Sequence, residues 1–257
     1  MPNQHEQAWE DWGALNPLYA ILTDPRYRHG ESDVDEFMAT GEGLANGVMG
    51  ECERLGLAIS RGRALDFGCG VGRVTLPLSR RFSEVIGLDV STSMIDSARR
   101  RHADQPNCTF EVHKESDLRR FPDLHFDLVF CVLVLQHLPS QGAIVRFLEE
   151  FARVLRPGGA LVVQLPSSVV VAPPLPGWRT RAGVRMRVAP LLRGLGVSPA
   201  YLYRRLDWVP AMTMMAVPDE MTRETLARGG LQVVFTTPPD VDLGGTVSQM
   251  YFATRPH

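Results

Sequence analysis

The sequence is poor in cysteine and in long apolar runs, and each shortage excludes a class of protein. The four cysteines, Cys52, Cys69, Cys108 and Cys131, form no CxxC pair, so we expect neither a disulfide framework nor a zinc site. The longest uninterrupted apolar run, Leu128 to Leu135, is far shorter than the roughly 20 residues that a membrane helix needs. We therefore expect no membrane span.

A basic excess is absent as well. The 257 residues carry 27 basic and 29 acidic side chains, a net charge of −2, whereas a nucleic-acid surface usually needs a surplus of basic residues. The first ten residues have neither the basic start nor the apolar stretch of a secretory signal, so we expect a cytoplasmic protein. No tight cluster of acidic or histidine residues indicates a metal site.

The charge balance hides a division of the chain into four regions. Residues 1–60 hold 11 acidic and 3 basic side chains, residues 61–165 hold 12 acidic and 14 basic, and residues 166–206 hold seven arginines and no acid. We expect an N-terminal helical cover at 1–60, a core at 61–165, a substrate-side insertion at 166–218, and a C-terminal helix with a β-hairpin at 219–257. The insertion is rich in proline and interrupts the pattern of the core.

Short apolar runs alternate with helix-like stretches in the core, which is the pattern of a parallel sheet with crossover helices. The predicted strands are Arg63–Phe67, Glu84–Asp89, Cys108–His113, Phe126–Leu133, Gly159–Leu165, Leu231–Thr237 and Val247–Thr254. The predicted helices are Asp33–Leu55, Val71–Arg80, Ser91–Arg101, Ser140–Leu155 and Asp219–Arg228. Pro157-Gly158-Gly159 should stop the helix that precedes it, and the last two strands should pair as an antiparallel edge. The expected fold is therefore doubly wound α/β.

A glycine turn between a predicted strand and a predicted helix is the most informative motif. Residues 64–73 read ALDFGCGVGR. Glycines allow a ligand to approach the backbone, and a helix start offers free N–H groups to a carboxylate or phosphate. The spacing is GxGxG, because the third glycine is Gly72 and Arg73 stands where the dinucleotide fingerprint requires glycine. An NAD-dependent oxidoreductase is therefore the least favoured reading.

An acidic residue, Asp89, ends the next predicted strand and lies beside the glycine turn. A carboxylate at this position can accept hydrogen bonds from both ribose hydroxyls of a nucleoside. NAD enzymes and methyltransferases share this feature, so it does not separate them.

Four motifs in order do separate them: LDFGCGVGR, GLDVSTSMIDSAR, FDLVFCVLVLQHL and LRPGG. Together they resemble the class I S-adenosylmethionine-dependent methyltransferase family, in particular its bacterial small-molecule branch. The resemblance covers about residues 60–165, and VSQMYFATR near the C-terminus resembles the closing strand of that family. It implies a Rossmann-like sheet of seven mostly parallel strands with an antiparallel C-terminal strand, a helical N-terminal cover and an insertion after the fifth strand. It also implies S-adenosyl-L-methionine as the cofactor.

The resemblance further implies roles for individual residues. Asp66 would brace the glycine loop, Asp89 would hold the ribose, and Arg73 would reach the carboxylate of the cofactor. The other implied cofactor contacts are Gly68, Cys69 and Gly70 along the methionine part, Val90 and Met94 beside the adenine, and Cys131 with its neighbours near the sulfonium. Lys114 occupies the position where the family usually has an acidic or amide residue. The adenine contact is therefore left to a backbone amide at Glu115 or Ser116, or to Asp117.

A base is needed only if the methyl acceptor is a group that must lose a proton, such as a hydroxyl. His137 follows the fourth predicted strand at the cofactor edge of the sheet, and its side chain has a pKa near neutrality. It is the candidate catalytic base, and the alternative role is to fix its loop by hydrogen bonding. His29 and His113 are expected at the surface.

These observations predict an enzyme that methylates a small-molecule acceptor, most simply an oxygen of a secondary metabolite, sugar or lipid. The Arg-rich stretch Trp178–Arg205 has three interpretations: a solvated basic face, a site for an anionic small-molecule or lipid acceptor, or a nucleic-acid surface. Nucleic acid is not favoured, because the fourth strand ends in Cys131-Val132-Leu133-Val134 and not in the Asn/Asp-Pro-Pro-aromatic signature of enzymes that methylate exocyclic amines of bases. An RNA or protein methyltransferase and a non-catalytic cofactor-binding module stay open as alternatives. The oligomeric state is not predicted.

Overall fold

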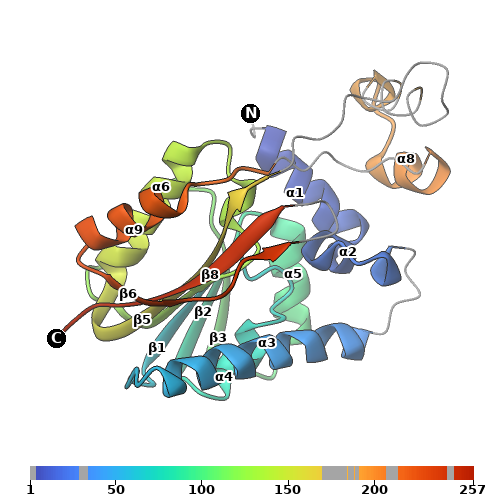
Figure 1. The fold of residues 1–257 in the computed structure, drawn as a ribbon. Helices are drawn as coiled ribbons and strands as arrows, with labels where there is room; N and C mark the ends of the chain where they lie inside the picture. The colour runs from blue at the N-terminus through green and yellow to red at the C-terminus, as the bar shows by residue number, and fades with distance from the viewer. Residues whose placement is uncertain are drawn as a thin grey trace.

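The computed structural model describes residues 4–28, 34–169, 184, 188, 191–206, 214–241 and 246–257, and within them one twisted sheet lies between two layers of helices (Figure 1). The strands are β1 (Arg63–Phe67), β2 (Glu84–Asp89), β3 (Cys108–Val112), β4 (Phe126–Cys131), β5 (Leu155–Ser168), β6 (Gln232–Thr236), β7 (Asp240–Val241) and β8 (Val247–Thr254). His29 and most of the predicted insertion lie outside the described residues.

The strands follow the order β3-β2-β1-β4-β5-β8-β6, and β7 pairs with β8. The first five strands in this order are parallel, whereas β8 runs antiparallel to both β5 and β6. This arrangement confirms the fold class expected from the sequence, with the short strand β7 as an addition. The strand order reverses between β1 and β4, and in doubly wound sheets a ligand crevice forms at such a point, outside the carboxyl ends of the strands.

The helices form two layers on the sheet. One layer contains α6 (Gln141–Val154) and α9 (Asp219–Arg228), and the other contains α3 (Val34–Arg54), α4 (Thr75–Ser79) and α5 (Thr92–Arg101). Alternate residues of β1 face these two layers, because successive side chains of a strand point to opposite faces. Leu65 and Phe67 pack in the core on the α6 side, and Ala64 packs in the core on the α3 side.

Two short helices and a helical turn at the N-terminus lie over the carboxyl end of the sheet. They are α1 (Gln4–Leu15), α2 (Pro17–Leu22) and the 3₁₀ turn η1 (Pro25–Tyr27). Figure 1 shows α1 and α2 beside α5, and it shows α8 (Pro199–Leu206) at the periphery beyond them. A second 3₁₀ turn, η2 (Leu135–His137), follows β4. No helix in the described parts of the chain has both the length and the apolar character to cross a membrane.

The strand predicted at Phe126–Leu133 ends two residues earlier, at Cys131. Two other predicted boundaries differ more, and in both cases a glycine conformation accounts for the difference. The helix predicted at Val71–Arg80 is shorter, since α4 begins at Thr75 and Gly72 in the preceding turn has a φ of 84°. Pro157-Gly158-Gly159 was expected to separate a helix from a strand, but β5 begins at Leu155 and runs through it. Gly158 has a φ of 72°, and the pairing of β5 with β4 shifts register beside it.

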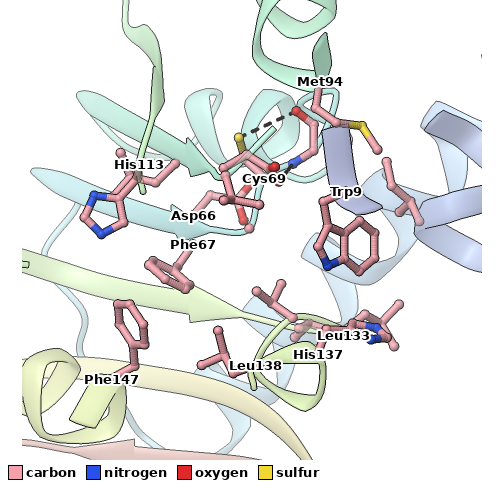
Figure 2. Close-up of a pocket in the computed structure, with 18 of the residues that line it drawn as sticks. Trp9, Asp66, Phe67, Cys69, Met94, His113, Leu133, His137, Leu138 and Phe147 are labelled. Atoms are coloured by element: carbon pink, nitrogen blue, oxygen red, sulfur yellow. Dashed lines mark hydrogen bonds between the residues drawn. The ribbon is translucent and has the colours of Figure 1, made fainter. Parts of the chain in front are cut away.

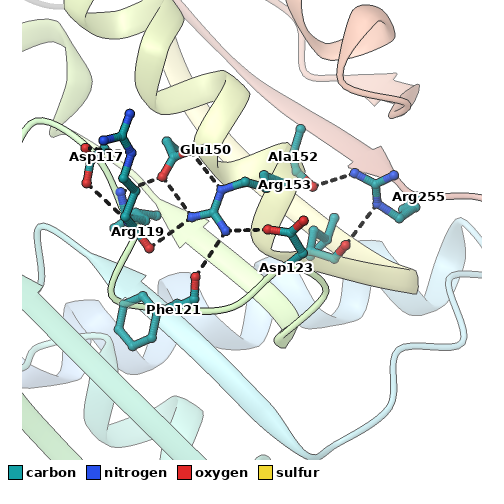
Figure 3. A network of polar contacts seen from close by, with 10 residues as sticks. Asp117, Arg119, Phe121, Asp123, Glu150, Ala152, Arg153 and Arg255 are labelled. Atoms are coloured by element: carbon teal, nitrogen blue, oxygen red, sulfur yellow. Dashed lines mark hydrogen bonds and ion pairs between the residues drawn. The ribbon is translucent and has the colours of Figure 1, made fainter.

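The loop between β3 and β4 is held on α6 by one arginine side chain (Figure 3). Arg153 donates to the carbonyl oxygens of Leu118 and Phe121, both at 3.0 Å, and to the carboxylates of Asp123 and Glu150, at 2.7 and 2.9 Å. These partners raise the pKa of Arg153, chiefly through the hydrogen bond to Glu150. Because the same loop begins with residues 113–116 at the cavity described below, this network positions one wall of the cavity.

Helix α3 approaches the glycine turn so closely that one of its positions has no room for a side chain. A Cβ atom at Gly41 would overlap the carbonyl oxygen and the Cγ atom of Arg73. A Cβ atom at Gly43, on the same helix, would meet nothing within 4 Å. The two glycines therefore form a matched pair.

We expect Gly41→Ala to lower the free energy of unfolding by about 1–3 kcal/mol, because the backbone of the turn must move to accept the methyl group. Gly43→Ala should raise it by about 0.5–1 kcal/mol, since alanine loses less conformational freedom in a helix. Chemical denaturation of both variants measures the difference. Equal effects of the two substitutions would contradict the close approach.

Candidate functional site

A cavity opens at the carboxyl ends of β1, β2 and β4, where the topology places a ligand crevice (Figure 2). The candidate base His137 lines it. Ten of the eleven predicted cofactor-binding residues line it as well: Asp66, Gly68, Cys69, Gly70, Arg73, Asp89, Val90, Met94, Glu115 and Ser116. Side chains from the N-terminal helices, Glu6, Trp9, Ala20 and Ile21, complete the wall. The predicted residues are therefore brought together from three loops and covered by α1 and α2.

The carboxylate of Asp89 ties two of these loops together. One of its oxygens accepts a hydrogen bond from the backbone N–H of Gly70 at 2.9 Å, and the other accepts from the N–H of Ser91 at 2.9 Å. Burial raises the pKa of Asp89 even though these two hydrogen bonds act in the opposite direction. Each carboxylate oxygen has a second lone pair, so Asp89 can still accept hydrogen bonds from a ligand in the cavity.

The glycine turn needs glycine for two reasons. Gly68 and Gly70 have φ values of 79° and 55°, a region in which side chains are strained. Added Cβ atoms would also strike Val134 at position 68 and Ile21 at position 70. The turn is thus pressed against η2 on one side and α2 on the other, which keeps its backbone at the cavity surface.

Asp66 lies beneath the turn and is buried. It accepts a 2.6 Å hydrogen bond from the hydroxyl of Thr75, at the start of α4. Burial raises the pKa of Asp66 to about 6, although this hydrogen bond and the positive charge of Arg73 oppose the change. The bracing role predicted for Asp66 is consistent with this position.

Arg73 brings a positive charge to the cavity wall. Its side chain is only 6% exposed, and one guanidinium nitrogen donates to the hydroxyl of Thr40 at 3.1 Å. Among the described residues its Nε atom has no hydrogen-bond partner. Burial lowers the pKa of Arg73, and the charge of Asp66 offsets part of that effect. A buried guanidinium with an unused donor at a cavity is suited to an anionic group of a ligand.

The N-terminal cover is attached to the cofactor side of the sheet through Glu10. Its carboxylate accepts from the hydroxyl of Ser91 at 3.2 Å and from the N–H of Ser93 at 3.2 Å, both at the N-terminus of α5. Burial alone would raise the pKa of Glu10, but the hydrogen bonds from Ser93 and Ser91 outweigh it and lower the pKa. A negative charge is favoured at a helix N-terminus, so this contact stabilises the cover in place. Gly13 of α1 has no room for a side chain against Ser91 and Met94.

His137 and Trp9 meet across the cavity. Their rings are 4.9 Å apart and nearly perpendicular, at 68°. The Nε2 atom of His137 lies 3.4 Å from the side-chain nitrogen of Gln136, which can only donate, so this contact favours a lone pair on Nε2. The backbone carbonyl of Gln136 accepts from the N–H of Met215 at 2.6 Å, where the chain returns from the insertion. The candidate base therefore lies between the N-terminal cover and the end of the insertion.

Two of the predicted placements differ from the structure. Cys131 is fully buried in the core and does not line the cavity; the residues that follow it, Val132, Leu133 and Val134, do. It is the last residue of β4, and its side chain points to the α6 layer of the core.

His113 is the second difference, because it is only 5% exposed and not at the surface. Its ring packs edge-on against Phe67 at 5.9 Å, and its Nδ1 lies 3.1 Å from a carboxylate oxygen of Glu115. Burial lowers the pKa of His113, opposed by that carboxylate. Residue 113 follows β3 and shares a face of the strand with Thr109 and Glu111, so the pattern of the strand does not predict its burial, which comes from packing against Phe67 and Phe147.

Several apolar residues line the cavity although the sequence does not predict that role for them. Figure 2 shows Phe67 and Phe147 facing each other, with Leu133 and Leu138 on the same side of the cavity. The sequence pattern predicts a strand that contains Phe67 and a helix that contains Phe147, and nothing more for either residue. Their periodicity predicts burial, but it does not distinguish a core position from a cavity wall. In the described ranges, no group of three or more His, Cys, Asp or Glu residues could hold a metal ion.

Comparison with known proteins places this cavity in a recognised domain. Residues 65–163 match the model of a family described as "Methyltransferase domain". The chain is 39% identical over 109 residues to a trans-aconitate 2-methyltransferase of Methylobacterium nodulans, a match that covers 42% of this chain and 39% of that protein. It is 36% identical over 101 residues to a ubiquinone biosynthesis O-methyltransferase of Bradyrhizobium sp. (strain ORS 278), covering 39% of this chain and 38% of that protein. These matches thus span less than half of either relative.

A solved structure resembles the chain over a greater length. The magnesium protoporphyrin IX methyltransferase of Synechocystis PCC 6803, crystallised with bound SAH, superposes with a TM-score of 0.57. The superposition covers 97% of this chain and 94% of that chain, at 18% sequence identity. At this identity the likeness describes the fold.

The raised pKa of Asp66 predicts how stability depends on pH. The folded chain binds a proton on Asp66 more tightly than the unfolded chain, so the contribution of this proton to stability is fully present below the ordinary pKa of 3.8 and is lost as the pH rises through the folded pKa of about 6. Relative to Asp66→Asn, the unfolding free energy of the wild type should fall by up to about 3 kcal/mol between about pH 4 and pH 7. Urea denaturation across this range measures it, and a difference that does not change with pH would refute the prediction.

Proposed function

We propose that this protein transfers a methyl group from S-adenosyl-L-methionine to a small-molecule acceptor, most simply to an oxygen atom. The match of residues 65–163 to a methyltransferase domain supports this proposal. The observation that carries the proposal is the position of the Asp89 carboxylate between the N–H groups of Gly70 and Ser91, at the mouth of the cavity. It supports recognition of a nucleoside at this edge of the sheet.

The residues present fit the chemical groups of this cofactor. Asp89 offers lone pairs to a ribose, and the backbone at Gly68 and Gly70 lies open at the cavity for the methionine part. Arg73 offers a buried donor to the carboxylate. The cofactor, when bound, supplies a methyl group that its sulfonium already activates. The chain must therefore align the acceptor and, for a hydroxyl, remove one proton.

His137 is the residue that we propose for proton removal. Its ring lines the cavity, and the Gln136 contact favours a lone pair on Nε2, which is the atom that would take the proton. Trp9 packs edge-on against the ring and limits its rotation. The histidine would thus be held in orientation by one residue of the cover and one residue of its own turn.

The apolar part of the cavity supports an acceptor with an apolar or aromatic body. Phe67, Leu133, Leu138 and Phe147 supply apolar surface, and Trp9 adds an aromatic face from the cover. The two relatives described above are named for trans-aconitate and for ubiquinone biosynthesis, which are different molecules. Residues 65–163 match the shared domain, so we propose that Trp9 and the other cavity residues outside that range distinguish one acceptor from another. Phe67, Leu133, Leu138 and Phe147 would supply apolar surface to any of them.

The cofactor proposal is tested by replacing one carboxylate inside the cavity and one outside it. Asp89→Ala should weaken binding of S-adenosylhomocysteine in calorimetry by at least about tenfold, since a hydrogen bond to a charged group contributes about 1.5–3 kcal/mol. Asp96→Ala, on the exposed side of α5 and paired with Arg99 at 3.5 Å, should leave the affinity unchanged. Equal affinities of the two variants would refute the nucleoside site.

Transfer itself is tested with S-adenosylmethionine labelled in the methyl group. The wild-type protein, incubated with a metabolite extract, should move the label into a small molecule, and Asp89→Ala should not. A protein that binds S-adenosylhomocysteine but never transfers label would be a cofactor-binding module, and the enzyme proposal would then be wrong. Label found in RNA or protein would point to a macromolecular acceptor.

Once an acceptor is known, His137→Asn and His137→Ala separate the two roles of this residue. A general base contributes about 10²–10⁴ in rate, so both variants should lose kcat by that factor with unchanged cofactor affinity. If asparagine restores the rate that alanine loses, hydrogen bonding of the loop is the role of His137.

A further inference from the structure

The surface that carries a further inference is the outer face of residues 191–205, which we call the basic lobe. In this stretch Leu191 is 69% exposed, Leu195 is 81% exposed and Tyr201 is 55% exposed. The N–H of Leu195 donates to the carbonyl of Leu191 at 3.1 Å, so these two leucines lie one above the other on one helical turn. Arg205, four residues after Tyr201 on α8, is exposed as well.

The inner face of the lobe is anchored to the N-terminal cover, so its outer face has a defined orientation. Leu202 is fully buried, and the hydroxyl of Tyr203 donates to the backbone carbonyl of Arg28. The side chain of Arg193 pairs with the carboxylate of Asp11, on α1. The lobe therefore rests on the same helix that contributes Trp9 to the cavity wall.

We propose that the basic lobe docks on the surface of an anionic phospholipid bilayer. Exposed leucines and a tyrosine next to arginine form the composition of an interfacial element, in which apolar side chains enter the acyl boundary and basic groups meet lipid phosphates. Residues 191–205 contain three arginines and no acidic residue, so an anionic surface complements the charge of the lobe. The lobe is a peripheral contact and does not cross the bilayer.

A second copy of the chain fits this face less well. A symmetric pair would place the same arginine-rich segment on both sides of one interface, where the like charges repel. RNA would satisfy the arginines but would leave the two leucines without an apolar partner. A bilayer satisfies both kinds of side chain.

The test uses the full-length protein, without cofactor, and vesicles of phosphatidylcholine with or without phosphatidylglycerol. Co-sedimentation should occur with the anionic vesicles and fall as salt is added, and it should be weak with phosphatidylcholine alone. The double variant Leu191→Asp/Leu195→Asp should bind the anionic vesicles at least about tenfold more weakly. The matched control is Leu124→Asp/Val241→Asp, which adds the same two charges at exposed positions outside the lobe and should bind like the wild type.

Far-ultraviolet circular dichroism and the thermal unfolding midpoint serve as the check that each variant is folded. Equal vesicle binding by the lobe variant and the control, or equal binding to neutral and anionic vesicles, would overturn the proposal. So would a wild-type dimer in light scattering that the lobe variant breaks, or RNA binding through the lobe without vesicle binding. The measurement needs no methyl transfer, so its outcome is independent of the proposed enzyme activity.

Discussion

The carboxylate of Asp89 is the contact on which the geometry of the cavity depends. It receives the N–H of Gly70 from the loop after β1 and the N–H of Ser91 from the start of α5. The glycine turn is held at the same place by the carbonyl of Leu88, which accepts from Gly68 and Cys69 at 2.7 and 2.9 Å. Two adjacent residues at the end of β2 thus determine where the turn lies, and a ligand in the cavity meets a turn that is already ordered.

The division of charge along the chain acquires a structural meaning in the N-terminal cover. The acidic cover and the arginine-rich segment are neighbours, since Asp11 of α1 pairs with Arg193. Glu10, the residue before it, accepts hydrogen bonds at the N-terminus of α5. One helix therefore uses two consecutive acidic residues to join the core to the basic lobe. Asp11 and Arg193 carry opposite charges and lie far apart in the sequence, and their ion pair holds α1 and the basic lobe together.

The sequence predicts the fold and most of the cavity because both depend on local patterns. Strand β4 has one polar residue, Asp127, among five apolar residues, and all six are buried. The glycine turn follows β1, and Asp89 is the last residue of β2. Positions that depend on contacts between distant segments were not predictable. Phe147 and Trp9 reach the cavity from two different helices, and neither position differs from a core position in its periodicity. Gly158 adopts its positive φ inside β5, so a motif that ordinarily stops a helix is accommodated in a strand.

The place of β8 in the sheet has a consequence for how the protein is made. This strand lies between β5 and β6 and pairs with both, although it spans residues 247–254. During synthesis β5 has only one neighbouring strand until these residues leave the ribosome, and its other edge stays open to unintended pairing. The core that contains the cavity is translated early, but its sheet can close only late. A nascent chain of this protein is therefore most exposed to aggregation while the segment between β5 and β8 is being translated.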